Sequence, residues 1–321
     1  MIINILLIIV GVALVLGGAD RLTEGASALA RRMNVPEIVI GLTIVAAGTS
    51  APELFVSLAS ALKGTPDLAV GNVVGSNIMN TLLIVGVTAM VAPMTIARAT
   101  VKKDIPFTVA ASVLLIILMM DDMSTVHISG NSISRLDGCI LLVALAAFMY
   151  YTFTVARKGS APAKAAQAIQ KAQHPLLCLL YVIVGLGCLV AGSNIFVDAA
   201  SAVATNLGVS QSVIGLTIVA GGTSLPELAT SVVAARKGQS AIAIGNVIGS
   251  NVFNILMILG LTAVVCPMRI EGITLIDLST MLLSVLMLWA FCYTKLKVER
   301  WEGAVLTAAF MAYLAWLLYN V

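Results

Sequence analysis

Charged residues are scarce in this chain of 321 residues: they make up 10% of it, while hydrophobic residues make up 60%. Because soluble domains carry about 25% charged residues, this composition excludes an ordinary soluble protein. The net charge is only +3, and no basic patch is interleaved with aromatic residues, so we expect no nucleic-acid partner. The mean hydropathy of +1.06 instead predicts an all-α integral membrane protein built of spanning helices in a lipid bilayer.

Cysteine and histidine are also sparse. The five cysteines lie in or beside apolar runs and none forms a CxxC pair, so we expect packing residues rather than metal ligands or disulfides. The two histidines, His127 and His174, lie in short polar connections. The chain contains no Walker motif or other nucleotide-binding segment, which argues against an ATP-driven pump and a nucleotide partner. An enzyme is not expected either, because no set of nucleophile and base stands out.

Ten segments are apolar enough and long enough to cross a bilayer, for which a helix needs about 20 residues. They cover approximately residues 2–30, 36–62, 68–92, 103–120, 134–155, 175–204, 210–235, 242–266, 273–293 and 301–320. The basic stretch 157–173 lies between the fifth and sixth segments and reads as a linker. We therefore predict one membrane domain with a first five-helix half over 1–156 and a second over 174–321.

Lysine and arginine are distributed unevenly among the connections. The odd-numbered connections hold 14 of them and the even-numbered connections hold 3. Since positive charge accumulates in cytoplasmic loops, this division predicts that both termini face outward and that the linker lies in the cytoplasm.

The chain also repeats itself at an offset of 174 residues. GLTIVAAGTSAPEL (41–54) recurs as GLTIVAGGTSLPEL (215–228), and GNVVGSNIMN (71–80) recurs as GNVIGSNVFN (245–254). About 32 of the 54 positions in 41–94 are identical to their counterparts. Because each half has an odd number of spans, the second copy enters the membrane from the opposite side, which predicts two inverted-topology repeats related by a pseudo-two-fold axis.

Each copy places one carboxylate, Glu53 or Glu227, near the middle of an apolar segment. A charge at mid-bilayer costs roughly 2.5–3.5 kcal/mol or more, so such an acid indicates function. The alternative is a structural residue, protonated or hydrogen-bonded, but duplication at matched depth favours a functional pair. Asn80 and Asn254 fall near the middle of the third and eighth segments, so the pseudo-two-fold axis would gather all four side chains into one cluster.

Both acids follow a predicted helix break. Pro52 and Pro226 lack an N–H group, and Gly48 and Gly222 weaken the helix before them. A break in lipid is tolerated only where the backbone lines a buried or wet site. The glycines of the GNVVGSN and GNVIGSN stretches are also expected to interrupt their helices, although close helix packing is the alternative explanation for them. Helices two, three, seven and eight are therefore predicted to be broken at the midplane.

Oxygen atoms would then surround the two acids. The candidate ligands are Glu53, Glu227, Asn80, Asn254, Ser76, Ser250, Thr49, Thr223, Ser50 and Ser224, with the backbone carbonyls of Ala46 and Ala220. Each hydroxyl has the alternative of bonding its own backbone. Hard cations such as Ca²⁺ and Na⁺ prefer an oxygen shell, whereas Zn²⁺ or Cu⁺ would require nitrogen or sulfur. Two carboxylates match one divalent or two monovalent ions, an equality that an exchanger can use.

The paired motifs GTSAPE with GNVVGSNIMN and GTSLPE with GNVIGSNVFN resemble the two alpha-repeats of the calcium:cation antiporter superfamily, which includes the sodium/calcium exchangers. The chain looks most like the compact prokaryotic members of YrbG type. The resemblance implies a secondary antiporter of the prokaryotic cytoplasmic membrane that exchanges Ca²⁺ for Na⁺ by alternating access, with no cofactor. It also implies ligand roles for the candidate residues and a sliding of the first and sixth helices against the others.

One position departs from the family pattern, because well-studied exchangers carry Asp where this chain has Asn254. The site thus has two formal charges rather than three, which leaves the identity of the ions open. An H⁺-coupled exchanger of Ca²⁺, Mn²⁺ or Mg²⁺ is one alternative, since two glutamates can carry two protons. A non-transporting or channel-like membrane protein is another, and the intact pair of acids counts against it.

Overall fold

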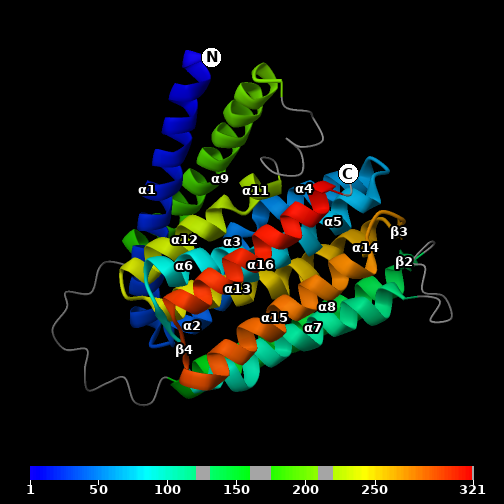
Figure 1. Cartoon of the computed structure of the whole chain (residues 1–321). Coiled ribbons are helices and arrows are strands. Elements are labelled where there is room, and N and C mark those ends of the chain that lie inside the picture. The colour runs from blue at the N-terminus through cyan, green and yellow to red at the C-terminus, as the bar shows by residue number, and fades with distance from the viewer. Residues whose placement is uncertain (121–130, 160–174, 209–219, 320–321) are drawn as a thin grey trace.

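The computed structural model describes residues 1–120, 131–159, 175–208 and 220–319, and these residues are mostly helical (Figure 1). The first half contains helices, three of which include a π-helical segment, here labelled η. Its elements are α1 (Ile2–Met33), α2 (Glu37–Ile40), η1 (Gly41–Val45), α3 (Ala46–Thr49), α4 (Ala51–Leu62), α5 (Pro66–Ile78), η2 (Met79–Ile84), α6 (Val85–Val91), η3 (Thr100–Asp104), α7 (Ile105–Met119) and α8 (Arg135–Gly159).

The second half follows the same order. Its elements are α9 (Pro175–Asn206), α11 (Ala220–Thr223), α12 (Leu225–Arg236), α13 (Ser240–Val252), η6 (Phe253–Leu259), α14 (Gly260–Val265), α15 (Leu275–Lys295) and α16 (Arg300–Tyr319). Residues 210–219 of the seventh predicted segment, both histidines and most of the linker 157–173 lie outside the described residues; α8 continues to Gly159.

By length and hydropathy, seven described helices are able to cross a bilayer, or eight if the bent pair Glu37–Thr49 and Ala51–Leu62 forms one span. The chain is therefore a multi-pass helical membrane protein, as the composition predicts. Two further predicted spans are not among these helices: η3 and α7 together form one helix over residues 100–119, and α12 has 12 residues. A total of ten spans thus stays a prediction.

The second and seventh predicted segments are interrupted where prolines were expected to break them. The helix axis bends by 45° between α3 and α4, and Ser50 at the junction has φ −82° and ψ 8°. Ser224 separates α11 from α12 with nearly the same backbone, φ −91° and ψ 7°. Pro52 and Pro226 follow two residues later and start new half-helices, a position where a missing N–H is harmless.

The third and eighth segments are not broken, so that part of the prediction is wrong. Pro66–Val91 and Ser240–Val265 each run as one continuous helix. Glycine weakens a helix but keeps its N–H group, whereas proline removes a hydrogen bond outright. In place of a break, each helix contains a π-helical segment, and these two segments carry Asn80 and Asn254. Segments of this kind often occur at functional sites.

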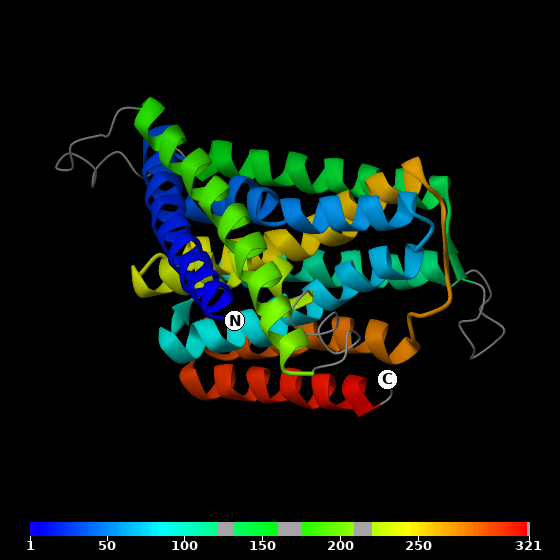
Figure 2. The same cartoon turned by 90° about the horizontal axis from the view of Figure 1, so that it is seen from above.

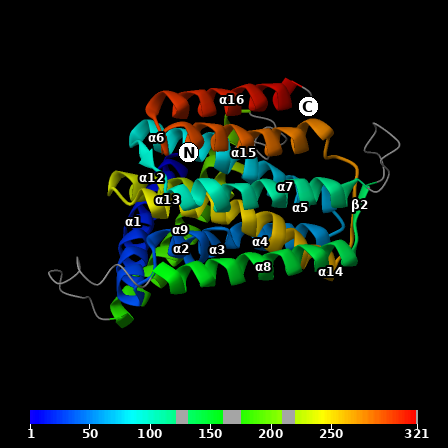
Figure 3. The same ribbon diagram turned by 90° about the horizontal axis from the view of Figure 1, so that it is seen from below.

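The centre of the bundle is formed by α13, in which every residue from Ile242 to Val252 is buried. Helices α8 and α16 lie at opposite edges of the bundle, with α13 between them (Figure 3). Two short antiparallel ladders also join the halves: β1 (Met94–Thr95) pairs with β4 (Lys297–Val298), and β2 (Asn131–Ile133) pairs with β3 (Met268–Ile270). Each ladder takes one strand from each half, so the two halves are joined at both ladders.

Helices α1 and α9 lie side by side, inclined to the rest of the bundle (Figures 1 and 2). Small residues let their backbones approach closely, as is typical of helix pairs in membranes. A Cβ atom added to Gly18 would lie 2.8 Å from the carbonyl oxygen of Gly185, and one added to Gly185 would lie 2.8 Å from the carbonyl oxygen of Gly18. The pair is therefore packed so tightly that neither glycine can be enlarged without a backbone shift.

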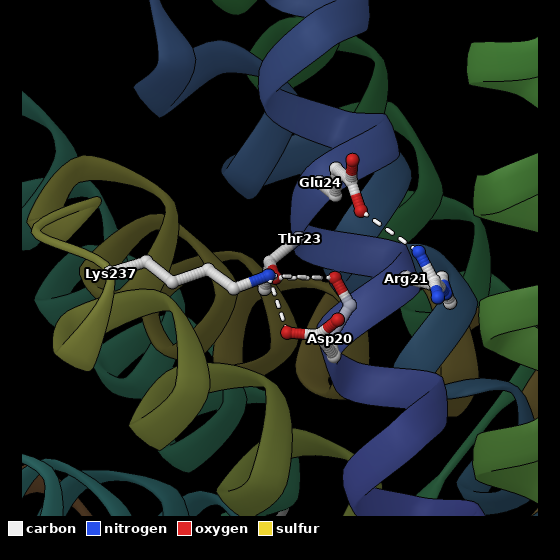
Figure 4. A network of polar contacts seen from close by, with 5 residues as sticks. All are labelled: Asp20, Arg21, Thr23, Glu24 and Lys237. Carbon is white, nitrogen blue, oxygen red and sulfur yellow. Dashed lines mark hydrogen bonds and ion pairs between the residues drawn. The ribbon is translucent and has the colours of Figure 1, made fainter.

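A lysine just beyond α12 ties that helix to α1 (Figure 4). The Nζ atom of Lys237 lies 2.7 Å from Oδ1 of Asp20, and it also donates to the Asp20 carbonyl at 3.0 Å and to the Thr23 hydroxyl at 3.3 Å. Arg21 instead pairs with Glu24 in its own helix at 3.2 Å. The contact of Lys237 thus connects the α1–α9 pair to the helix that carries Glu227.

Candidate functional site

The two predicted acids, Glu53 and Glu227, are both buried, with a relative exposure of 1% for each residue. Each stands in the first turn of the half-helix that begins after a break, α4 for Glu53 and α12 for Glu227. The N-terminal end of a helix carries a partial positive charge, which favours a carboxylate in that turn. The breaks therefore both admit the acids to the interior and stabilise their charge.

The serine at each break hydrogen-bonds the acid of the other half. Ser50 donates to Oε1 of Glu227 at 3.1 Å, and Ser224 donates to Oε1 of Glu53 at 3.2 Å. The two bonds are related by the offset of the sequence repeat. They place the two acids and the two breaks in a single cluster.

The threonines before these serines also contact the acid of the other half. The Thr49 side chain interacts with the carboxyl group of Glu227, and the Thr223 side chain interacts with that of Glu53. Thr49 also donates to Oδ1 of Asn246 at 3.0 Å. Both predicted threonines thus contact the acid that lies on the opposite half.

The predicted serines of the third and eighth helices complete the hydroxyl shell. Ser250 donates to Oε1 of Glu227 at 3.4 Å. The hydroxyl oxygens of Ser76 and Ser224 lie 3.4 Å apart, and Ser224 is itself bound to Glu53. All six predicted hydroxyl residues therefore contact an acid or a neighbour of one.

The two backbone carbonyls fit the expectation less directly. The carbonyl of Ala46 accepts from the Ser50 N–H at 3.0 Å, and the Thr49 hydroxyl oxygen also lies 3.3 Å from it. A cation would have to replace the Thr49 hydroxyl there, so the ligand role of Ala46 stays a prediction. Ala220 is the first residue of α11, directly after residues that lie outside the described ranges, and its role also stays a prediction.

Asn80 and Asn254 are bound through their NH₂ groups to asparagines of the other half. Asn80 Nδ2 donates to Oδ1 of Asn251 at 3.1 Å, and Asn254 Nδ2 donates to Oδ1 of Asn77 at 3.0 Å. Sequence reasoning did not place Asn77 and Asn251 among the site residues. Their exact match at the repeat offset is the signal that would have found them.

Four predicted site residues each keep one buried oxygen that has no hydrogen-bond partner among the described residues. These atoms are Oε2 of Glu53, Oε2 of Glu227, Oδ1 of Asn80 and Oδ1 of Asn254. Buried polar atoms are normally paired, so such a set calls for an explanation. All four are acceptors and all are oxygens, which suits a hard cation. Within the described ranges no three His, Cys, Asp or Glu residues gather as a soft-metal site would require.

A second matched pair of asparagines fixes the half-helices that carry the acids. Asn72 donates to the carbonyl of Glu53 at 3.2 Å, and Asn246 donates to the carbonyl of Glu227 at 3.3 Å. The same two amides each donate, at 3.0 Å, to a serine one turn later in that half-helix. These asparagines were also absent from the sequence prediction, although they match at the repeat offset.

Known proteins resemble this chain along nearly its whole length. A family model described as sodium/calcium exchanger protein matches residues 3–154 and 177–319. The putative antiporter CaxA of Alkalimonas amylolytica is 35% identical over 322 residues, which cover 98% of each chain. The inner membrane protein YrbG of Escherichia coli (strain K12) is 36% identical over 319 residues, 97% of this chain and 95% of that one. The sodium/calcium exchanger MaX1 of Methanosarcina acetivorans is 32% identical over 350 residues, 99% of each.

The fold also matches a solved structure. The sodium-calcium exchanger NCX_Mj, soaked with Na⁺ and Ca²⁺, superposes with a TM-score of 0.83 and 29% sequence identity. The match covers 98% of this chain and 98% of that one, so it extends over both halves.

Proposed function

The chain belongs to the sodium/calcium exchanger protein family, and from that premise we propose that it exchanges Ca²⁺ for Na⁺ across a prokaryotic cytoplasmic membrane. The exchange is secondary transport by alternating access. The observation that carries this proposal is the set of four unpartnered oxygens on Glu53, Glu227, Asn80 and Asn254, counted among the described residues. They come from both halves, and the two acids among them lie in one hydroxyl-lined cluster.

The ligand shell follows from this cluster. Ca²⁺ takes 6–8 oxygen ligands in flexible geometry. The four unpartnered oxygens supply part of that number, and the hydroxyls of Ser50 and Ser224 already point at the acids. Carbonyls at the breaks, including those of Ala46 and Ala220, would complete the shell. Na⁺ would use the same oxygens, and competition between the two ions for one set of ligands is what couples their movements.

Charge explains why the movements must be coupled. Two carboxylates carry a formal charge of −2, so one Ca²⁺ or two Na⁺ neutralise them. An empty site keeps its charge in a medium where buried charge is strongly disfavoured. The loaded forms therefore change access more readily than the empty form, and uptake of one ion depends on release of the other. With Asn254 in place of an acid, the proposed exchange moves no net charge.

The proposed architecture has ten spans in two inverted five-helix repeats, over 1–156 and 174–321, with both termini outside. The reciprocal bonds across the halves and the matched interruptions at Ser50 and Ser224 support the repeat. The lysine and arginine distribution supports the orientation. The tightly packed α1–α9 pair is the unit that would slide against the other helices, since it packs as one body inclined to them (Figure 2).

Transport by purified protein in proteoliposomes tests the proposal. An outward Na⁺ gradient should drive saturable uptake of radiolabelled Ca²⁺, and Glu53→Gln or Glu227→Gln should abolish it. Glu271→Gln is the matched control, because that acid is 73% exposed and lies outside the cluster. Uptake driven by a pH gradient without Na⁺ would replace Na⁺ by H⁺ as the counter-ion. Unchanged flux in both glutamine variants would reject the site, and flux without any counter-ion would indicate a channel.

A further inference from the structure

The orientation of two amide groups decides whether the cluster attracts or repels a cation. An asparagine side chain has an oxygen that accepts and an NH₂ group that donates, and the two exchange places when the amide turns over. With the oxygen inward, Asn80 and Asn254 add ligands for a cation. With the NH₂ inward, they would present positive hydrogens to it.

Two side chains, Asn251 and Thr81, hold the amide of Asn80 through a series of hydrogen bonds. Asn251 Nδ2 donates to the hydroxyl of Thr81 at 2.8 Å. The Asn251 oxygen is thereby turned toward Asn80, whose NH₂ group donates to it at 3.1 Å. All three side chains are buried, and Oδ1 of Asn80 is left without a partner among the described residues. A hydroxyl can donate as well as accept, so Thr81 holds the Asn251 amide in place, and the direction of the Asn80 amide follows that of Asn251.

The amide of Asn254 is fixed in a related way. Its NH₂ group donates to Oδ1 of Asn77 at 3.0 Å, and the Asn77 amide donates to the backbone carbonyl of Asn251 at 3.3 Å. The position that matches Thr81 in the second half is Ile255, which has no hydroxyl. The Asn254 arm is therefore anchored on a backbone atom, whereas the Asn80 arm is anchored on a side chain. A single substitution at Thr81 can remove the anchor of the Asn80 arm.

We propose that Asn251 and Asn77 are positioning residues that hold the oxygens of Asn80 and Asn254 toward the cation and their NH₂ groups away from it. Asn251 and Asn77 do not themselves bind the ion. This role rests on the proposed function, namely that the cluster binds a cation. It assigns a purpose to two buried asparagines that otherwise only join the two halves.

The reason that orientation needs to be enforced lies in the acids. The π segment η2 packs against α12, which carries Glu227, and η6 packs against α4, which carries Glu53. Both acids have an unpartnered oxygen among the described residues. An amide released from its partner would turn its NH₂ group toward that oxygen and close the empty site to a cation. If the oxygen then faced inward a tenth of the time, the apparent affinity would fall about tenfold.

A double-mutant cycle separates orientation from simple packing. Asn251→Ala should weaken equilibrium binding of radiolabelled Ca²⁺ about tenfold in the natural background. In an Asn80→Asp background the same change should cost less than about twofold, because a carboxylate presents an oxygen whichever way it turns. A role in packing alone would give the same fold-change in both backgrounds, and that result would overturn the proposal. Thermal unfolding of each variant checks that it folds.

Two further variants keep the test decisive if Asn251→Ala does not fold. Thr81→Val removes only the hydroxyl that anchors Asn251, and it should weaken Ca²⁺ binding a few-fold in the natural background and not in Asn80→Asp. Asn77→Ala with Asn254→Asp repeats the cycle on the other arm. Equal losses in both backgrounds in these cycles would likewise reject the positioning role.

The proposed function can fail separately. If the natural protein binds no Ca²⁺, or if Glu53→Gln leaves binding unchanged, the cation site itself is rejected. If the natural protein binds Ca²⁺ and Glu53→Gln abolishes binding, but the cycle shows equal losses, only the role of Asn251 and Asn77 is rejected.

Discussion

Ser50 donates a hydrogen bond of 3.1 Å to the carboxylate of Glu227, from which it is separated by 177 positions in the chain. The matched bond from Ser224 to Glu53 spans 171 positions. Each acid is therefore held by a residue of the other half. Neither half contains a complete site, which explains why both copies of the motif are present in one chain.

Removing either of these hydroxyls should weaken cation binding by a similar amount. A hydrogen bond to a charged group contributes about 1.5–3 kcal/mol, so Ser50→Ala and Ser224→Ala should each lower Ca²⁺ affinity roughly tenfold or more. Thr294→Ala is the control, because that exposed hydroxyl bonds a carbonyl in its own helix turn and lies outside the cluster. Equilibrium Ca²⁺ binding checks the prediction, and a large effect of one serine with none of the other would contradict the reciprocal arrangement.

The acids should make the ion-free protein less stable. Each has a buried carboxylate oxygen without a partner in the described part of the chain. Glu53→Gln or Glu227→Gln removes one of two buried like charges, which should raise the free energy of unfolding by about 1–3 kcal/mol when Ca²⁺ and Na⁺ are absent. Thermal unfolding in a chelating, Na⁺-free buffer measures this. Lower stability of both glutamine variants would show that the acids serve structure.

Added Ca²⁺ should stabilise the natural protein but not the glutamine variants. A ligand at 100 times its Kd stabilises the folded protein by about 2.7 kcal/mol. The natural protein should gain this stabilisation and the glutamine variants should not, in the same unfolding measurement.

The two asparagines that hold the half-helices, Asn72 and Asn246, should contribute to the stability of the folded protein. Asn72 and Asn246 each donate to the carbonyl of an acid and to a serine. Substitution by Ala leaves buried acceptors unpaired, which should destabilise the protein by about 1–3 kcal/mol in either case. Thermal unfolding of Asn72→Ala and Asn246→Ala tests this, and no change in either would show that the amides do not brace the site.

The tie between Lys237 and Asp20 is half-exposed, with side-chain exposures of 32% and 48%. An ion pair of this kind is worth about 1 kcal/mol at most. Asp20→Asn should therefore lower stability only slightly, while Lys237→Asp should lower it further by placing two acids together. The double charge reversal, Asp20→Lys with Lys237→Asp, should restore part of the loss. If it restores nothing, the contact does not hold α1 against α12.

The sequence repeat was enough to predict the acids, the breaks before Pro52 and Pro226, and the hydroxyls that surround them. A proline or an acid in an apolar segment has few structural explanations, so its position alone is informative. An internal match at a fixed offset then tells which of these positions belong together.

The partners of these residues were not predictable in the same way. Ser50 bonds Glu227 and not Glu53, although Glu53 lies in the same half as Ser50. This choice of partner depends on how the two halves are rotated against each other. The glycine spacing predicts breaks where the structure has the π segments η2 and η6, because glycine weakens a wide helical turn and a true interruption alike. Strands of two or three residues and the contact of Lys237 with Asp20 leave no periodic signal at all.

Equilibrium binding of radiolabelled Ca²⁺ to the purified protein, counted per chain, tests the central claim most directly. A pocket shared by Glu53 and Glu227 predicts a single site per chain, and either Glu53→Gln or Glu227→Gln alone should abolish it. If each substitution instead removed half of the bound Ca²⁺, the two acids would serve separate sites and the account would be contradicted.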